Sequence, residues 1–368
     1  MNLPANVSQV NDHWFKANRH YLVSHIEWLK LLLQRSWPDH ATAENEQKIV
    51  QLQQAIALQK STAPAPFSID CLSSVFELTE FEKLTLLLAI ADEFDSSLLK
   101  NPQGEGHLTV NFSLALAILP SPEWDALLPA ATLRKWGLVN IKPDNGLTHS
   151  RLMVPESIVH FLAGISGEDA NVLKLSEPLD HVRFKLSNQS EAQANAISAL
   201  AVQPGNTFSS QLFFTLTGDC RQTKRDLVTK IGQLLGVNVR ILSSVFIPST
   251  IDELNDFIMN WEREILLNNY FLYIECEASP ASHADKDNMI DFFIDRLKWP
   301  VIVGADQKRS FTLKDQFGFE VVNPTVEEQR YYWEQLIDDQ HKPAQNIEQV
   351  AAHFDLNYRD IQMCSAQL

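Results

Sequence analysis

The second half of the chain alternates short apolar segments with longer amphipathic ones, and this constrains its fold more than any other feature. The predicted strands cover 211–216, 238–242, 270–275, 301–304 and 319–322, and the predicted helices cover 191–201, 224–235, 251–267, 285–297 and 325–337. Strands that alternate with helices in this way form a parallel sheet with both faces covered. Ligands of such sheets bind at the carboxyl ends of the strands, so we expect a functional site there.

The first of these strands leads through a turn into a helix. Residues 212–225 read LFFTLTGDCRQTKR, in which Gly218 and Lys224 match the first Gly and the Lys of the phosphate-binding pattern G-x-x-x-x-G-K-[ST]. Thr223 replaces the second Gly, and Arg225 replaces the hydroxyl residue that would hold Mg²⁺. A side chain at the second Gly crowds a phosphate, and a guanidinium cannot ligate a cation, so we expect weak or absent Mg-nucleotide binding. The alternative is an ordinary strand, turn and helix without a ligand.

The strand over 270–275 carries the next chemical signal. In nucleotide hydrolases of this plan such a strand ends in Asp-Glu, where the Asp holds Mg²⁺ and the Glu polarises the attacking water. Here Glu275 takes the place of the Asp and Cys276 that of the Glu. A thiol is a poor general base, and the following strand, 301–305, offers no amide or hydroxyl for a γ-phosphate. We therefore predict no catalytic residue in this chain.

The first half is predicted to be mainly helical. Its predicted helices cover 8–35, 41–60, 69–76, 80–94, 108–119, 121–136 and 156–162, and 164–179 is predicted to be a connector. Thr79 and Glu82 have the spacing of a capping box at the start of the helix over 80–94. Asn145-Gly146 lies between apolar segments at 138–141 and 148–154, which predicts a hairpin. Helices followed by a two-stranded hairpin form a winged-helix-like domain.

A winged-helix domain can place a helix in the major groove of DNA. The chain has 30 basic against 46 acidic residues, a net charge of −16, which opposes binding through phosphate neutralisation. Residues 121–136 contribute only Arg134 and Lys135 as basic groups, and Lys142 and Arg151 are the other candidates for DNA contact. The sequence therefore favours a protein-contact or packing role for this block over DNA binding.

Composition excludes several classes of protein. No uncharged apolar run reaches the roughly 18 residues needed to span a bilayer, and the N-terminus lacks the pattern of a signal peptide, so we expect no membrane partner and a cytoplasmic location. The four cysteines form no C-x-x-C pair and the histidines have no metal-binding spacing, so we expect free thiols and no metal site. Cys220, close to Lys224 and Arg225, is either a reactive thiol or a filler residue.

Together these residues resemble the AAA+ ATPase family. More narrowly, the order of the blocks, the run WEREILL at 261–267 and the run FEVVNPTVEEQRYYW at 319–333 are similar to large bacterial tandem AAA+ proteins. In that group a degenerate first module precedes an intact second one, and some members are associated with contractile injection systems. The run VAAHFDLNYRDI at 350–361 resembles the helices that follow in the family's lid.

The resemblance implies a multidomain fold. It consists of a mainly α N-terminal part with a winged-helix-like domain, an α/β parallel-sheet AAA+-like (P-loop) module and a partial helical lid. The implied boundaries are 1–60 for the helical hairpin, 67–165 for the winged-helix-like domain, 180–322 for the degenerate AAA+-like module and 323–368 for the start of the lid. The chain ends inside that lid.

The resemblance also implies ligands and site residues. ATP or ADP would bind weakly, with Mg²⁺ only alongside nucleotide, and the nucleotide-binding positions are Gly218, Thr223, Lys224, Arg225 and Glu275. Arg309, next to Lys308, is either a residue that acts on a neighbouring subunit or a solvated surface charge. No residue matches the family's catalytic Glu, so the chain's own site is expected to be inactive.

Three functions follow from these observations. The first is a regulatory and assembly portion of an AAA+ machine, which recruits protein partners through its N-terminal domains and packs with a second AAA+ module. The second is a winged-helix DNA-binding regulator whose α/β module senses a ligand. The third is a weak nucleotide-binding enzyme that relies on Gly218, Lys224 and Glu275.

Overall fold

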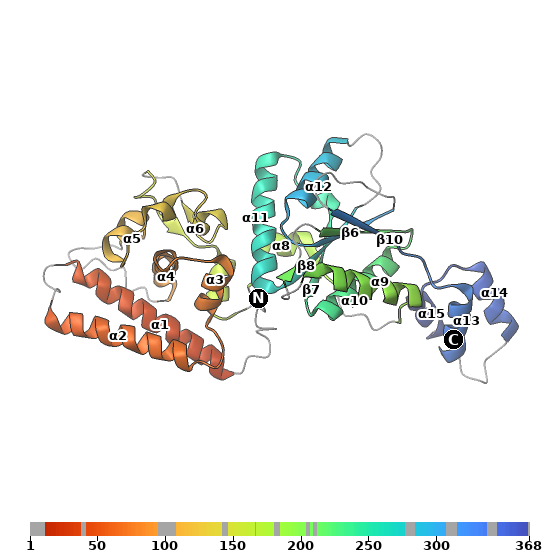
Figure 1. Ribbon diagram of the computed structural model, residues 1–368, viewed down its shortest axis with the longest axis horizontal. Coiled ribbons are helices and arrows are strands. Elements are labelled where there is room, and N and C mark those ends of the chain that lie inside the picture. The colour runs from red at the N-terminus through yellow and green to blue at the C-terminus, as the bar shows by residue number, and fades with distance from the viewer. Residues whose placement is uncertain are drawn as a thin grey trace. The chain divides into compact units, whose positions relative to one another are not determined.

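The chain divides into two units, with the division between Ala170 and Asn171, and each unit is described by itself. The computed structural model describes residues 12–37, 42–94, 108–141, 146–165, 167–179, 185–203, 207–208, 212–276, 284–306, 315–336 and 344–366 (Figure 1). Within these residues, no helix is both long and apolar enough to cross a membrane. The four cysteines all lie in the described ranges, and no disulfide joins them.

A six-stranded sheet forms the centre of the second unit, counted over the described residues. Its strands are β3 (Ser176–Pro178), β6 (Leu212–Thr217), β7 (Asn238–Ser243), β8 (Tyr270–Glu275), β9 (Val301–Ala305) and β10 (Asp315–Glu320). Their order is β10-β6-β9-β8-β7-β3, and every pairing is parallel except that of β3 with β7. Counted from β6, the parallel strands lie in the order 5-1-4-3-2, which is consistent with an AAA+-like fold.

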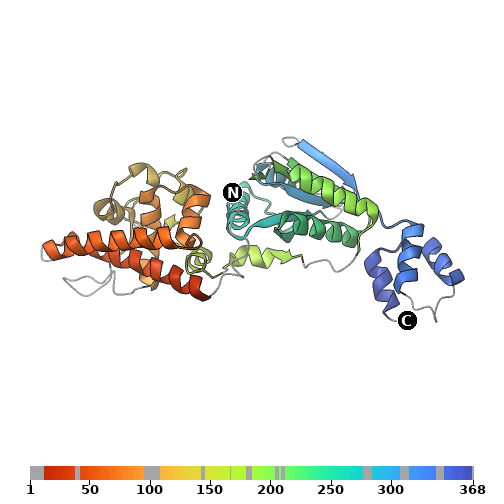
Figure 2. The same cartoon turned by 60° about the horizontal axis from the view of Figure 1, so that its bottom comes forward.

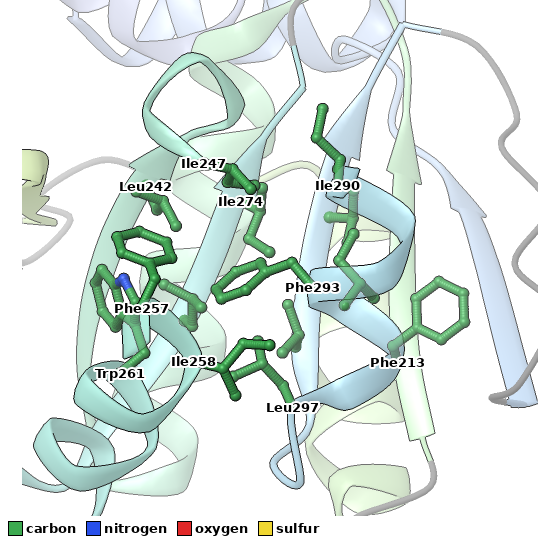
Figure 3. Packing of buried hydrophobic residues seen from close by; sticks show 14 of the residues in the cluster. Phe213, Leu242, Ile247, Phe257, Ile258, Trp261, Ile274, Ile290, Phe293 and Leu297 are labelled. Atoms are coloured by element: carbon green, nitrogen blue, oxygen red, sulfur yellow. The ribbon is translucent and has the colours of Figure 1, made fainter. Parts of the chain in front are cut away.

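Helices cover both faces of this sheet, as the continuous apolar strands predict. They are α9 (Asn188–Ala201), α10 (Arg221–Leu235), α11 (Ile251–Asn268) and α12 (Ala284–Arg296). Phe213 packs in the cluster with Trp261 of α11 and Phe293 of α12, which Figure 3 shows from close by. Its neighbour Phe214 packs in the other cluster, with α9 and α10. Adjacent residues of one strand therefore fill opposite layers.

Two predictions for this unit are wrong. The stretch 164–179, predicted to be a connector, contains the helix α8 (Ala170–Leu175) and the edge strand β3. The edge strand β10 lies earlier than the predicted 319–322. Both strands are largely exposed, because an edge strand needs no apolar run on its outer side, so the apolar pattern missed β3 and indicated only the end of β10.

Three helices follow the sheet: α13 (Val326–Leu336), α14 (Ala344–His353) and α15 (Tyr358–Ser365). We call them the C-terminal helical group. They bury Tyr332, Trp333, Ile347, Tyr358 and Ile361 in a core of their own. Figure 2 shows these blue helices gathered together. The predicted helix over 325–337 is confirmed by α13.

The first unit is mainly helical, as predicted. Its described elements are α1 (Asp12–Arg35), α2 (Ala43–Thr62), α3 (Ser68–Phe76), α4 (Glu80–Phe94), α5 (Phe112–Ile118), the 3-10 helix η3 (Trp124–Leu127), α6 (Thr132–Lys135), β1 (Asn140–Ile141), β2 (Leu152–Met153) and α7 (Glu156–Leu162). The capping box is confirmed: the Thr79 amide donates to the Glu82 carboxylate, and the Glu82 amide donates to the Thr79 hydroxyl, both at 3.1 Å. β1 and β2 pair antiparallel.

The predicted helix over 121–136 is wrong in its extent. η3 and the short α6 replace it, and Ser121 has a φ of +51° that interrupts helical geometry where the helix was expected to begin. The predicted hairpin strands are also shorter than expected. Of the Asn-Gly turn, Asn145 lies outside the described residues, whereas Gly146 has a φ of +82°. Lys142 lies outside them as well.

A buried asparagine that the sequence analysis did not predict joins parts of the first unit. The Asn18 amide donates to the Leu162 carbonyl at 2.9 Å, and its side-chain oxygen accepts from the Ser68 amide at 2.9 Å. Because Asn18 is fully buried, these bonds hold α1 against the start of α3 and the end of α7.

His25 of α1 makes the stability of the first unit sensitive to acid. Burial, the main cause, and the charge of Lys83 lower the pKa of its imidazole to about 4, although the backbone contact with Tyr21 opposes this. Unfolding returns the pKa to about 6.5. The folded state therefore binds fewer protons below that pH, and its stability falls as the pH drops from about 6.5 to about 4. We expect a loss of up to about 3 kcal/mol over this window in urea unfolding of the first unit.

The control for this prediction is His25→Phe, which keeps an aromatic ring against Tyr21 and cannot be protonated. This variant should be nearly insensitive to pH over the same window, whereas His160→Phe, at an exposed position, should behave as the parent chain does. Equal acid sensitivity in the parent and in His25→Phe would contradict the assignment.

Candidate functional site

A cavity of about 590 Å³ opens at the carboxyl ends of β6 and β10, where ligands of parallel sheets bind. Its lining residues are Thr217, Gly218, Asp219, Cys220, Asp306, Gly318, Phe319, Glu320, Val321, Val322, Asn323 and Asp355. Gly218 therefore lies where the sequence analysis placed it, beside a cavity at the edge of the sheet.

Gly218 begins the loop, and its position requires glycine. Its φ is +143°, and a Cβ built on it would lie 2.2 Å from the carbonyl oxygen of Val321. The amide of Val321 also donates to the carbonyl of Thr217 at 2.7 Å. The loop thus runs directly against the chain that leaves β10, and no side chain fits between the two backbones.

Lys224 is buried, and its ammonium group has partners within the protein. Its Nζ donates to the carbonyl oxygens of Gly218 at 2.7 Å and Ala305 at 3.2 Å, and to the carboxylate of Asp306 at 3.4 Å. An ammonium group has three donors. All three are used at the base of the loop, so binding a phosphate would require breaking at least one of these bonds.

Glu275 accepts from two arginines of α10. Arg225 donates Nε to Oε1 at 2.6 Å and a terminal nitrogen to Oε2 at 2.9 Å, and Arg221 donates Nε to Oε2 at 2.7 Å. A terminal nitrogen of Arg221 also bonds Oε2. Burial alone would raise the pKa of the Glu275 carboxyl, but the hydrogen bonds from Arg225 and Arg221 and their charges outweigh it and hold the pKa below its usual value. The carboxylate is therefore ionised and bonded through both oxygens.

Thr223, at the position of the second Gly of the pattern, bonds the segment that leads into the C-terminal helical group. Its hydroxyl donates to the side-chain oxygen of Asn323 at 2.8 Å. The Asn323 amide donates in turn to the backbone carbonyl of Asp355 at 3.1 Å and to its carboxylate at 3.0 Å. Close by, the Asn357 amide contacts the Cys220 sulfur at 3.5 Å.

The cavity is lined by carboxylates. Asp219, Asp306, Glu320 and Asp355 contribute to its lining and are exposed. Within the described residues, no group of three His, Cys, Asp or Glu side chains has the arrangement of a metal site. These carboxylates repel an anionic ligand in the cavity, since like charges in close proximity interact unfavourably.

Four of the five predicted nucleotide-binding residues lie together, Gly218 in the turn before α10 and Thr223, Lys224 and Arg225 at its start. The fifth, Glu275, bonds Arg225. Arg309 and Lys308 lie outside the described residues. No sequence pattern indicated a role for Arg221, Asn323 or Asp355. A signal existed for Asp306, which directly follows β9 at the carboxyl end of the sheet.

Comparison with known families identifies one domain. A family profile described as "Winged helix domain, variant" matches residues 34–176, which is less than half of the chain. The predicted winged-helix arrangement is therefore confirmed. The chain consists of a helical N-terminal part with a winged-helix domain, followed by a mostly parallel α/β module consistent with an AAA+-like fold. No curated protein matches the chain.

Three solved structures resemble part of the chain weakly. They are described as the structure of C. elegans PCH-2 (TM-score 0.36, 10% identity, 52% of this chain and 67% of that chain), the structure of Rhizobiales Trip13 (0.31, 11%, 47% and 77%) and the E. coli MS115-1 HORMA:CdnC:Trip13 complex (0.32, 7%, 50% and 89%). TM-scores this low establish neither a common fold nor a common function.

Proposed function

We propose that this chain is the regulatory and assembly portion of an AAA+ machine. Its AAA+-like module does not hydrolyse ATP but provides a surface for packing, and its N-terminal domains recruit a protein partner. The observation that carries the proposal is the pairing of the loop's charged groups within the protein: Lys224 with two backbone carbonyls and Asp306, and Glu275 with Arg221 and Arg225.

The chemistry of the site supports this proposal. Hydrolysis needs a carboxylate to hold Mg²⁺ through water and a base to activate the attacking water. Glu275 has both oxygens bonded to guanidinium groups, and the next residue is the buried Cys276. The acidic lining of the cavity opposes a triphosphate as well. The module has the parallel α/β fold, whereas the groups that would perform hydrolysis are either absent or bonded to other groups of the protein.

The winged-helix domain supports protein recruitment over DNA binding. Arg134, one of the few basic candidates, donates to the Leu127 carbonyl at 2.6 Å and is thereby used within the domain. Trp124 and Leu128, at the neighbouring turn, are 61% and 51% exposed. Exposed aromatic and aliphatic side chains are typical of protein interfaces, whereas DNA-binding surfaces are basic.

Calorimetry with ATP and ADP tests the nucleotide part of the proposal. We expect no saturable binding, with or without Mg²⁺, because a phosphate must displace the partners of Lys224 and enter an acidic cavity. Lys224→Ala should behave like the parent chain, as should Lys230→Ala, a matched change on the same helix where the lysine pairs with Glu191 of α9. Micromolar binding that Lys224→Ala abolishes and Lys230→Ala preserves would overturn the proposal, and so would measurable ATP turnover.

Electrophoretic mobility of labelled duplex DNA tests the partner class. The proposal predicts no shift at physiological salt. A shift that weakens as salt is added would indicate phosphate contacts and would favour a DNA-binding regulator. The variant Arg151→Ala, at an exposed position of the hairpin, would then be expected to weaken it.

A further inference from the structure

The C-terminal helical group is joined to the loop by polar side chains. Its apolar residues form their own cluster, which has no member in common with the two clusters that cover the sheet. Asn323 bonds Thr223 and Asn357 contacts Cys220, whereas Asp355 accepts from Asn323 and so connects that residue to the helical group. Such bonds are directional and can be broken one at a time, unlike an apolar core.

Asn323 is the central residue of these contacts. Its side-chain oxygen accepts from Thr223, and its amide donates to both the backbone and the side chain of Asp355. Both ends of the amide are therefore used in bonds between parts of the chain that are far apart in sequence. An amide held at both ends fixes the relative position of its partners better than a single bond does.

Thr223 provides a bond that the phosphate-binding pattern would not allow. Glycine at this position would have no hydroxyl to donate to Asn323, whereas the Thr223 side chain is buried and donates at 2.8 Å. The substitution that opposes phosphate binding is thus the one that creates the contact. Asn357 adds a second point of contact, because it caps α15 through the Asp360 amide at 2.9 Å and also touches Cys220.

We propose that Thr223, Asn323 and Asp355 form a latch that holds the C-terminal helical group on the loop without any nucleotide. The protein itself, and not a bound phosphate, then sets the position of these helices. This inference goes beyond the proposed function, because it concerns how the helices are held and not what the module binds or recruits.

The reporter for the latch is Cys220, whose sulfur contacts Asn357 and is partly covered. The measurement is the rate of alkylation of each cysteine in the full chain without nucleotide, resolved by peptide mass spectrometry. Cys71 of the first unit is the internal reference, and the buried Cys276 reports general loosening of the second unit. The variants are Thr223→Val, Asn323→Ala and the two combined. Asn195→Ala is the control, since the Asn195 amide donates to a carbonyl of its own helix.

We expect each single variant to raise the rate at Cys220 about fivefold relative to Cys71, the factor expected when one hydrogen bond of about 1 kcal/mol is lost from the closed state. In the double variant, the increase in the Cys220 rate should be much smaller than the product of the two single-variant increases, because both changes remove the same chain of bonds. Asn195→Ala should leave the rate unchanged, and Cys276 should stay protected throughout.

Three results would overturn the latch. The first is an unchanged Cys220 rate in Thr223→Val and Asn323→Ala. The second is a parallel rise at Cys276, which would show that the variants loosen the whole unit and not the contact. The third is a double variant whose effect equals the product of the two singles, since independent sites give additive free energies. None of these results depends on whether the module binds nucleotide, so failure of the latch is distinct from failure of the proposed function.

Discussion

Replacing Glu275 with glutamine will destabilise the second unit by about 3 kcal/mol in urea unfolding. Glu275 is 4% exposed and accepts from both Arg221 and Arg225, so the neutral amide removes the negative charge to which both guanidinium groups are bonded. Breaking a buried ion pair by changing one partner typically costs about 3–5 kcal/mol. The lower end applies here because the side chain of Arg221 is 57% exposed and can turn to solvent.

The matched control for this change is Glu320→Gln, an exposed carboxylate of the same cavity, which should alter stability by less than about 0.5 kcal/mol. The sign of the pH dependence gives a second check. Because the pKa of folded Glu275 is lowered, its contribution is present above the usual value of about 4.5 and is lost as the pH falls below it. The stability difference between the parent and Glu275→Gln should therefore shrink in acid. A difference that grows in acid would contradict this role for Glu275.

Replacing Gly218 with alanine will also destabilise the second unit by about 3 kcal/mol, for a different reason. The φ of +143° disfavours any L side chain. The new methyl group would in addition lie 2.2 Å from the carbonyl oxygen of Val321, which is backbone and cannot rotate away as a side chain can. The loop or the end of β10 must move, and we expect faster hydrogen exchange of the Val321 amide, which bonds the Thr217 carbonyl.

A variant at Gly236, the C-cap of α10, distinguishes the cost of the positive φ from the cost of the close backbone contact. Its φ is +65°, and an added Cβ would meet nothing within 4 Å. Gly236→Ala should therefore cost only the conformational penalty, about 1 kcal/mol. If Gly218→Ala costs no more than Gly236→Ala, the close approach of the two backbones does not constrain the loop, and the geometry described above is wrong at this point.

The charged groups of the site are bonded within the protein, and this has a consequence for the loop. Lys224, Glu275 and Thr223 each bond other groups of the protein, and these bonds hold the loop in place. Its residues then contribute to stability and to the position of the C-terminal helical group. This is the behaviour expected of a module whose role is packing, and the variants above measure it directly.

Local patterns in the sequence predicted much of this structure. The helix over 80–94, its capping box at Thr79 and Glu82, and the strand over 270–275 agree with the observed bounds. The reason is that periodicity and capping depend on neighbouring residues, which the sequence shows directly. The edge strand β3 was not predicted, and β10 was predicted with the wrong bounds, because exposed edge strands require no apolar pattern.

The sequence by itself determined that an α/β module with a loop at Gly218 follows a helical, winged-helix part. Its apolar spacing dictates which side chains leave water, whatever their partners are. Only the tertiary structure decided what the polar groups of the site bond. Thr223 and Asn323 lie 100 residues apart and Arg225 and Glu275 lie 50 apart, so strand order and helix placement bring them together. A short polar side chain can pair with many partners, and the fold selects one.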